Sequence, residues 1–379
     1  MKPCLALLFT FALTLSCATR VLAQDVPADT TARFLAGLPV RDTPLESLCR
    51  NQSWVDHATE FDKAWAELDK RQLTKIRAWS TEFLTDASAD KAPMFYMFSG
   101  PDILYAREFF PNASTYVLAG LEPVGTIPDV QHLQAGALSA GLANLRKSLN
   151  SVLSFSFFIT KDMKVDLRQN ALSGTLPILY VFLERAGCKI DSVQLVWLDK
   201  AGSVSTTKAN TPGVKIVFFG QSGAQQTLYY FESDLSNEGI KSQPGYVKFC
   251  ESLGTGRALL KAASYLPHSG NFTTARDFLL THCSTIVQDD SGIPVKYFAS
   301  SKWAVRYFGN YTAPIKIFEK EYQADLAEIY KKSHPPALPF GFGYSWHASQ
   351  SSLMLATFRG GESGDNSSPP TKPATTPAQ

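Results

Sequence analysis

After its first residues the sequence has no long apolar run, and this excludes a membrane-spanning helix in the rest of the chain. It also lacks an excess of one charge: 36 Lys and Arg stand against 34 Asp and Glu, for a net charge of +2. Proteins that bind nucleic acid or an anionic membrane surface usually carry a basic stripe, and none is present. The sequence therefore predicts no nucleic-acid partner.

The motifs of several cofactor and enzyme classes are missing as well. There is no G-x-G-x-x-G and no G-x-x-x-x-G-K-[ST], so dinucleotide and nucleoside-triphosphate binding lack their phosphate cradle. There is no C-x-x-C, H-E-x-x-H or His-x-His, so a metal site would need ligands that are distant in the sequence. Ser345, between Tyr344 and Trp346, is not in the G-x-S-x-G context of a nucleophile elbow. We expect no cofactor and no metal.

The amino-terminal residues predict export. Lys2 precedes the apolar stretch of residues 4–15, which is too short to span a bilayer, and Val21-Leu22-Ala23 is a small-x-small cleavage pattern. This predicts a signal peptide over residues 1–23 and a periplasmic or secreted mature protein beginning at Gln24. The alternative is a lipoprotein anchored through Cys17, because residues 14–17 form a degraded lipobox. The Thr where Leu is usual favours the first interpretation.

The mature chain divides by composition into a body and a tail. Residues 24–359 hold enough of the 45% hydrophobic and 12% aromatic residues to build a large core, as one large domain or two ordinary ones. Residues 360–379 are rich in Ser, Pro and Thr and have no core-forming side chain, which predicts a disordered tail. Cys49, Cys188, Cys250 and Cys283 remain in the body, and export would allow them to form disulfides, although a core of this size does not need them.

Hydrophobic spacing predicts mixed helices and strands in the first part of the body. Apolar residues recur every three or four positions over residues 53–86, which is typical of a helix, and we assign its tryptophans to the core. A strand at 92–98, a short helix through Phe109 and a strand at 116–121 predict a parallel βαβ unit. The next expected elements are helices at 130–149 and 172–186, a strand at 154–160, and an antiparallel meander of strands at 192–198, 214–219 and 227–232.

The second part of the body is expected to be richer in helix. Beyond a polar loop at 236–245, we expect helices at 246–253, 257–265, 272–282 and 315–329, and strands at 284–287, 295–298, 303–308 and 353–358. The strands at 295–298 and 303–308 are expected to form a hairpin. The predicted fold class is α/β with a mixed, α/β/α-like sheet and a helix-rich C-terminal half. The alternative is an α+β protein of two domains divided near residues 236–245.

Four phrases give the chain a resemblance to a known family. They are Phe98-Ser99-Gly100-Pro101-Asp102, Leu121-Glu122-Pro123-Val124-Gly125, Gln288-Asp289-Asp290-Ser291-Gly292-Ile293-Pro294 and Leu338-Pro339-Phe340-Gly341-Phe342-Gly343-Tyr344. With these segments, which span most of the mature body, the chain resembles a family of exported bacterial proteins whose function is unknown. The resemblance implies export and implies no activity.

The candidate catalytic residues are four acids: Asp102, Glu122, Asp289 and Asp290. Asp102 and Glu122 each follow a predicted strand, where open α/β sheets place their ligands, and the adjacent Ser99 and Gly100 are candidate ligand-binding residues. Asp289-Asp290 lies in a turn, where adjacent acids commonly form an Asx-type turn with a solvated partner. Brought together across a cleft, such acids would supply the general acid and the base or nucleophile that hydrolysis of a glycosidic bond requires.

The Gly-rich, aromatic segment 341–347 is the other candidate for contact with a ligand. Tyr344 and Trp346 have faces on which a sugar would stack, and His347 adds an imidazole, although a packed loop explains the same composition. Two functions are therefore expected. The first is a carboxylate-based hydrolase acting on an envelope or extracellular substrate; the alternative is a non-enzymatic protein that binds a small molecule or an envelope polymer.

Overall fold

The computed structural model describes residues 26–85, 91–155 and 172–360. The predictions for the signal peptide, Cys17 and the tail beyond Gly360 lie outside these residues. So does most of the strand predicted at 154–160, whose first two residues instead end a helix, α6 (Ala135–Phe155).

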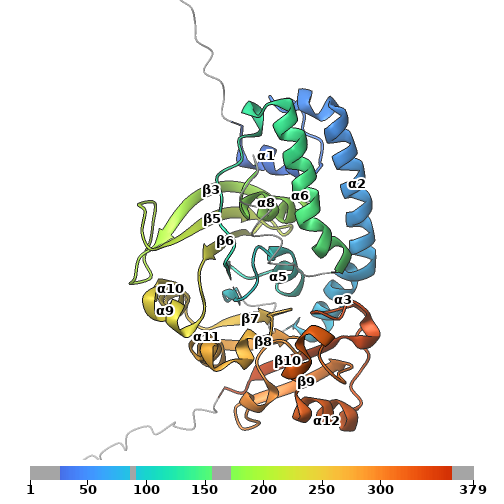
Figure 1. Cartoon of the computed structure of the whole chain (residues 1–379), viewed down its shortest axis with the longest axis vertical. Helices are drawn as coiled ribbons and strands as arrows, with labels where there is room; N and C mark the ends of the chain where they lie inside the picture. The colour runs from blue at the N-terminus through green and yellow to red at the C-terminus, as the bar shows by residue number, and fades with distance from the viewer. Residues whose placement is uncertain (1–25, 86–90, 156–171, 361–379) are drawn as a thin grey trace, which may run out of the picture.

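One ten-stranded mixed sheet runs through the molecule in the order β4-β3-β5-β6-β2-β1-β7-β8-β10-β9 (Figure 1). Its five central strands are parallel, whereas the pairs at both edges are antiparallel. In chain order the strands are β1 (Met94–Tyr96), β2 (Thr115–Gly120), β3 (Lys189–Leu198), β4 (Val204–Ser205), β5 (Thr211–Phe219), β6 (Gln225–Glu232), β7 (Gly256–Leu260), β8 (Cys283–Gln288), β9 (Trp303–Gly309) and β10 (Ser352–Phe358). The predicted α/β class is confirmed, and strands from both sides of residues 236–245 share this sheet.

Alternation along the central strands divides the core into two layers. In β1, Met94 and Tyr96 face one cluster of buried residues, and Phe95 faces the other. β7 repeats the pattern, with Leu259 on the first face and Leu260 on the second. Because successive side chains of a strand point to opposite faces, a sheet buried on both faces needs apolar residues at every position. The sheet therefore carries helices on both sides.

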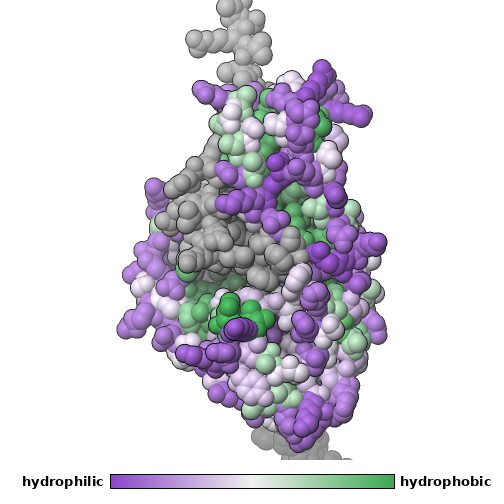
Figure 2. Space-filling view, turned by 45° about the vertical axis from the view of Figure 1, so that its right-hand side comes forward, coloured by the Kyte–Doolittle hydropathy of each residue, from purple (hydrophilic) through white to green (hydrophobic). Residues whose placement is uncertain are grey.

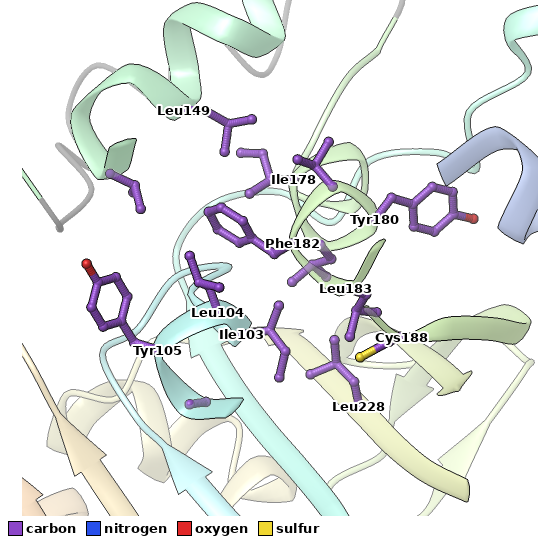
Figure 3. Close-up of a cluster of buried hydrophobic side chains, with 14 of the residues drawn as sticks. Ile103, Leu104, Tyr105, Leu149, Ile178, Tyr180, Phe182, Leu183, Cys188 and Leu228 are labelled. Carbon is purple, nitrogen blue, oxygen red and sulfur yellow. The ribbon is translucent and has the colours of Figure 1, made fainter. Parts of the chain in front are cut away.

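The first layer holds the helices of the amino-terminal half. They are α1 (Ala28–Leu35), α2 (Gln52–Leu68), α3 (Thr74–Phe83), α5 (Ile103–Phe109), α6 and α8 (Leu176–Arg185). The helix predicted at 53–86 is confirmed as far as Phe83, except that it begins at Gln52 and that a π-turn at Asp69–Leu73 separates α2 from α3. Figure 3 shows α5 and α8 meeting over the sheet, with Leu104 and Phe182 between them. Pro177 lies in the first turn of α8, where its missing N–H costs nothing.

The second layer contains α9 (Asn237–Ser242), α10 (Gly245–Ser252) and α11 (Thr273–His282), which pack on the opposite face. The helix predicted at 257–265 is wrong, because residues 256–260 form β7 between β1 and β8. Arg-Ala-Leu-Leu-Lys favours a helix by propensity, but every residue of β7 is buried, and tertiary pairing overrides propensity at such a position.

Two further predictions in the C-terminal half fail. Residues 295–298 do not form a strand, since Val295–Tyr297 is a 3₁₀ turn, and β9 pairs with β10 instead. The helix predicted from 315 to 329 is interrupted: a 3₁₀ segment (Lys316–Glu321) precedes α12 (Ala324–Ser333). The final strand is confirmed as β10.

The cysteines, the apolarity of the helices and the surface are described last. All four cysteines of the described residues are free, and Cys188, Cys250 and Cys283 are buried. Across residues 26–85, 91–155 and 172–360, no helix combines the length and apolarity that a membrane crossing requires. Figure 2 shows a face dominated by hydrophilic residues, on which a small hydrophobic group lies beside the grey atoms.

Candidate active site

A group of polar side chains gathers where the central parallel strands end. The alternation that places Tyr96, Leu259 and Val287 on the α5 face also places Lys261 and Asp289 there, because each lies two residues beyond a strand residue of that face. β1, β7 and β8 are neighbours, so these side chains meet at one edge of the sheet. This is the edge at which open α/β sheets bind ligands.

Asp102 is the first member of the group and precedes α5. Its Oδ1 accepts a hydrogen bond from the Tyr105 backbone N–H at 3.3 Å, and its Oδ2 accepts one from the Tyr96 hydroxyl at 2.9 Å. The Nζ of Lys261 lies 2.9 Å from the same Oδ2. The side chains of Asp102 and Lys261 are only 3% and 1% exposed, so this is a buried ion pair.

Burial shifts the pKa values of the two partners in opposite directions. Removal from water raises the pKa of Asp102, and the charge of Lys261 partly offsets that rise. Removal from water likewise lowers the pKa of Lys261, and the charge of Asp102 partly restores it. The Lys261 ammonium also lies 3.4 Å from the centre of the Tyr105 ring, whose face is negative. Asp102 and Lys261 therefore each stabilise the charged form of the other.

Asp289 follows β8 and accepts several hydrogen bonds. Its Oδ1 accepts from the backbone N–H of Ser291 at 3.1 Å and from the Ser291 hydroxyl at 2.5 Å, and its Oδ2 accepts from the backbone N–H of Ala262 at 3.1 Å. Burial, followed by the charge of Asp290, nevertheless raises the pKa of Asp289. Burial therefore favours the protonated form of Asp289.

Asp290 points to a different set of partners. Its Oδ2 accepts a hydrogen bond from the Tyr265 hydroxyl, and its Oδ1 accepts one from the Ser352 hydroxyl at 3.2 Å. Asp289 and Asp290 both line a cavity of about 10 Å³, which has room for about one water molecule. The turn is of the predicted Asx type, because the Asp289 Oδ1 accepts from the Ser291 backbone N–H, and Asp289 itself is buried.

The backbone around this group is unusual. Of the six described non-glycine residues with positive φ, four follow β1 or β7: Phe98 (63°), Ala262 (52°), Ser264 (52°) and Tyr265 (54°). Each such conformation costs free energy and persists only where the surroundings enforce it; residues of this kind concentrate at functional sites. The turn after β7 presents the Ala262 N–H to Asp289 through this geometry.

The predicted aromatic segment covers the group. Tyr344 places its hydroxyl between the Ser264 backbone N–H, which donates to it at 3.0 Å, and the Ala262 carbonyl, which accepts from it at 3.0 Å. Gly343 lies against Asp289 so closely that a Cβ there would be 1.7 Å from Oδ2. Trp346 and His347 are exposed and contact each other, with ring centres 4.4 Å apart.

Glu122, Ser99 and Gly100 lie one strand away. Glu122 is 2% exposed, and its Oε2 is 3.4 Å from the Tyr230 hydroxyl and 3.5 Å from where a Cβ of Gly100 would stand. The Ser99 hydroxyl donates to the Gly100 carbonyl at 2.8 Å. Of the predicted residues, the structure therefore groups Asp102, Asp289, Asp290 and Tyr344, and it places Glu122 with Ser99 and Gly100 beside them.

Sequence reasoning missed Lys261, which was assigned to a helix, and the tyrosines Tyr96, Tyr105 and Tyr265. A lysine directly after an apolar run was the one available sign of a buried cation. Within the residues that the structure describes, no three His, Cys, Asp or Glu side chains are grouped so that they could hold a metal ion. No protein-family model, no curated protein and no solved structure matches this chain.

Proposed function

We propose that the protein is a carboxylate-based hydrolase whose reacting groups are Asp289 and Asp102. The observation that carries this proposal is the meeting of two carboxyl groups with different environments at the carboxyl edge of β1, β7 and β8. Burial raises the pKa of both carboxyl groups, but Asp102 has a cation at 2.9 Å that partly offsets the rise, whereas Asp289 accepts hydrogen bonds from neutral donors. Two acids held in different protonation states are what acid–base hydrolysis requires.

The roles follow from these environments. Asp289 carries the proton and donates it to the leaving oxygen as the general acid. Asp102, whose ionised form Lys261 stabilises, acts as the base that activates water or as the nucleophile. Lys261 and Tyr96 are positioning residues, because both hold the Asp102 Oδ2. A glycosidic bond of an envelope or extracellular polymer is the substrate class that suits this pair.

Access to the acids requires movement of the covering segment. The cavity that Asp289 lines holds about 10 Å³, which is far smaller than a sugar ring. Tyr344 and Gly343 close this side, and their neighbours Trp346 and His347 are already exposed. We infer that the 338–347 segment lifts from Ala262 and Ser264 when substrate binds, and that Trp346 then stacks on the polymer.

The test is hydrolysis of purified envelope polysaccharides and peptidoglycan, measured as the release of reducing ends. Wild-type protein should cleave at least one polymer, and Asp289→Asn and Asp102→Asn should each lower kcat by at least about 100-fold, the usual scale for losing a general acid or base. Asp199→Asn is the matched control, because Asp199 lies in the β3–β4 turn and its Oδ1 accepts only local backbone N–H groups. Full activity in Asp289→Asn, or no cleavage of any polymer by folded wild-type protein, contradicts the proposal.

The second candidate is non-enzymatic binding of a small molecule or envelope polymer through the exposed Trp346–His347 pair. An exposed tryptophan (47%) next to an imidazole offers a stacking surface without any opening. If Trp346→Ala abolishes polymer binding while no polymer is hydrolysed, binding replaces hydrolysis as the function.

We also propose that the protein is exported, as the 1–23 segment and the family resemblance indicate. Amino-terminal sequencing and intact mass of the exported protein test this. A start at Gln24 supports a free periplasmic or secreted protein, an acylated Cys17 shows a lipoprotein, and a retained Met1 contradicts export.

A further inference from the structure

A larger cavity, of about 310 Å³, lies directly beside the candidate acids. It shares Val295 and Gln323 with the cavity of about 10 Å³ that Asp289 and Asp290 line. Its volume is at the lower end of the range, about 300–1,000 Å³, that sites for small molecules usually have. The proposed hydrolysis assigns no role to this space.

Gln323 lies between the two cavities, since it lines both. Its Oε1 accepts a hydrogen bond from the Val295 backbone N–H at 3.2 Å, and its Nε2 donates one to the Asp290 carbonyl at 3.0 Å. The Nε2 of His268, which also lines the larger cavity, lies 3.2 Å from the same carbonyl. A ligand in the larger cavity would therefore contact the side chains that hold the backbone of a candidate acid.

The charges in the wall of the larger cavity balance. Lys296 and Lys320 supply two positive charges, and Glu321 and Asp325 supply two negative ones. Burial lowers the pKa of His268 to about 4, so its imidazole adds no charge at neutral pH. An ion would be attracted by one pair of side chains and repelled by the other, so the wall favours a ligand without net charge. The ammonium and carboxylate groups are donors and acceptors for hydroxyl groups.

An exposed aromatic ring belongs to the same wall. Tyr322 is 51% exposed, and its ring stacks on that of Tyr311 with centres 6.5 Å apart. Pro294 and Val295 add apolar surface. A pyranose ring carries hydroxyl groups at its rim and C–H groups on its faces. It therefore matches a cavity in which charged groups stand beside an aromatic face.

The cavity also adjoins the segment that covers the acids. The 3₁₀ segment Lys316–Glu321 ends in two residues of the cavity wall. Its Phe318 packs on Tyr265 and Tyr344, with ring centres 4.8 Å and 5.1 Å apart. Tyr344 belongs to the segment that closes over Asp289. The cavity, the candidate acids and their cover are therefore neighbours at one edge of the sheet.

We propose that this cavity is a subsite for one neutral sugar unit of the polymer, with a face of the sugar on Tyr322 and its hydroxyl groups on the charged side chains of the wall. The assignment of that sugar to a substrate rests on the proposed function, whereas the binding of a neutral sugar does not. Contacts with a unit beside the scissile bond would position that bond at the acids, because binding energy from remote parts of a substrate serves its orientation.

Isothermal titration of the full-length protein with N,N′-diacetylchitobiose and with cellobiose tests the site, and digalacturonate is the charged control. A probe that the protein cleaves is titrated into Asp289→Asn instead. At least one neutral disaccharide should bind saturably and more tightly than digalacturonate. Tyr322→Ala should weaken its binding by about tenfold or more, the scale of a lost stacking contact. Phe358→Ala, which removes a ring 41% exposed on β10 outside the cavity wall, should leave binding unchanged.

A variant that fills the cavity gives an independent test. Ala324 is exposed at the first position of α12 and lines the cavity, so Ala324→Trp should abolish binding while Tyr322 stays intact. Ala201→Trp, at an exposed position in the β3–β4 turn, is the matched control and should bind as wild type does. Absence of saturable binding of both neutral disaccharides overturns the sugar site, and so does binding that both cavity variants leave unchanged.

Hydrolysis by the same variants separates this inference from the proposed function. Where wild-type protein cleaves a polymer, Tyr322→Ala and Ala324→Trp should each lower kcat/KM by about tenfold or more. Cleavage with unchanged kcat/KM in both variants overturns the role of the cavity as a substrate subsite and leaves the hydrolase intact. Sugar binding that both variants abolish, without cleavage of any polymer, contradicts the hydrolase and leaves the sugar site.

Discussion

The Nζ of Lys261 lies 2.9 Å from the Oδ2 of Asp102, and both side chains are almost completely buried. The two residues are far apart in the sequence and meet because β7 pairs directly with β1. The pair therefore links the turn after β1 to the turn after β7.

Removing one partner should be far more costly than removing both. Asp102→Asn keeps an oxygen for the Tyr105 N–H but removes the carboxylate in contact with the buried Lys261 ammonium, so we expect a loss of about 3–5 kcal/mol in the free energy of unfolding. Asp102→Asn combined with Lys261→Met should recover most of that loss. Urea denaturation measures both variants.

The control for this prediction is an exposed pair of the same length. Glu328 and Lys332 are also 2.9 Å apart, but their side chains are 53% and 74% exposed. Glu328→Gln should change stability far less than Asp102→Asn, because water replaces the lost partner. Equal losses in the two variants would show that burial does not set the strength of the Asp102–Lys261 pair.

Gly343→Ala should displace the segment that covers Asp289. A Cβ at this position would stand 1.7 Å from the Asp289 Oδ2, and its φ of +65° is unfavourable for alanine. Gly223 provides the comparison, with a φ of +77° and no atom within 4 Å of an added Cβ. Both variants should lose about 1–2 kcal/mol from the left-handed backbone, and Gly343→Ala should lose about 2 kcal/mol more from the overlap. Thermal denaturation that ranks the two equally contradicts this contact.

His57 should make the protein less stable in mild acid. Its Nε2 donates to the Leu35 carbonyl at 2.8 Å, and burial lowers its pKa from 6.5 to about 4. Because the folded-state pKa is lower than the unfolded one, the unfolded chain binds the proton first as the pH falls from 6.5 to 4. The stability from neutral His57, about 3 kcal/mol, is therefore present above pH 6.5 and lost as the pH falls through this range.

Denaturation at several pH values in wild-type protein and in His57→Phe tests this effect. The variant should show a shallower fall between pH 6.5 and 4, with the remaining slope due to other groups such as His268, whose pKa burial also lowers to about 4. His132→Gln, at an exposed site, should retain the wild-type slope. A His57→Phe curve parallel to the wild-type curve would rule out titration of His57.

Glu184→Gln should stabilise the protein at neutral and mildly alkaline pH. Burial, then the charge of Asp29, raises the pKa of Glu184 from 4.5 to about 9, and its Oε1 has no hydrogen-bond partner among the residues that the structure describes. A raised folded-state pKa means that the stability of protonated Glu184 is present below pH 4.5 and is lost as the pH rises toward 9. The glutamine variant avoids this loss, so its advantage over wild type should grow by about 4 kcal/mol from about pH 4.5 to about pH 8. Glu60→Gln, at an exposed position, should show no such growth.

The local sequence determined two kinds of element: helices that bury a single apolar stripe, and units in which a recognisable turn separates short strands. The helix at 53–86 was predictable because its apolar residues repeat with the helical period, and the βαβ unit was predictable because a Gly-Pro turn separates two short apolar runs. The positions of Asp102 and Glu122 followed from the same unit, since they come directly after its two strands.

Tertiary structure decided which of these strand ends meet and which segment covers them. Residues 256–260 have the composition of a helix. Only their pairing with β1 and β8 makes them a strand, and this strand places Lys261 next to Asp102. Asp289 is buried because Gly343 and Tyr344, more than fifty residues further along the chain, lie over its turn. Periodicity reports the local environment of a segment, but a fully buried strand has no polar face, so its sequence cannot say which strands lie beside it.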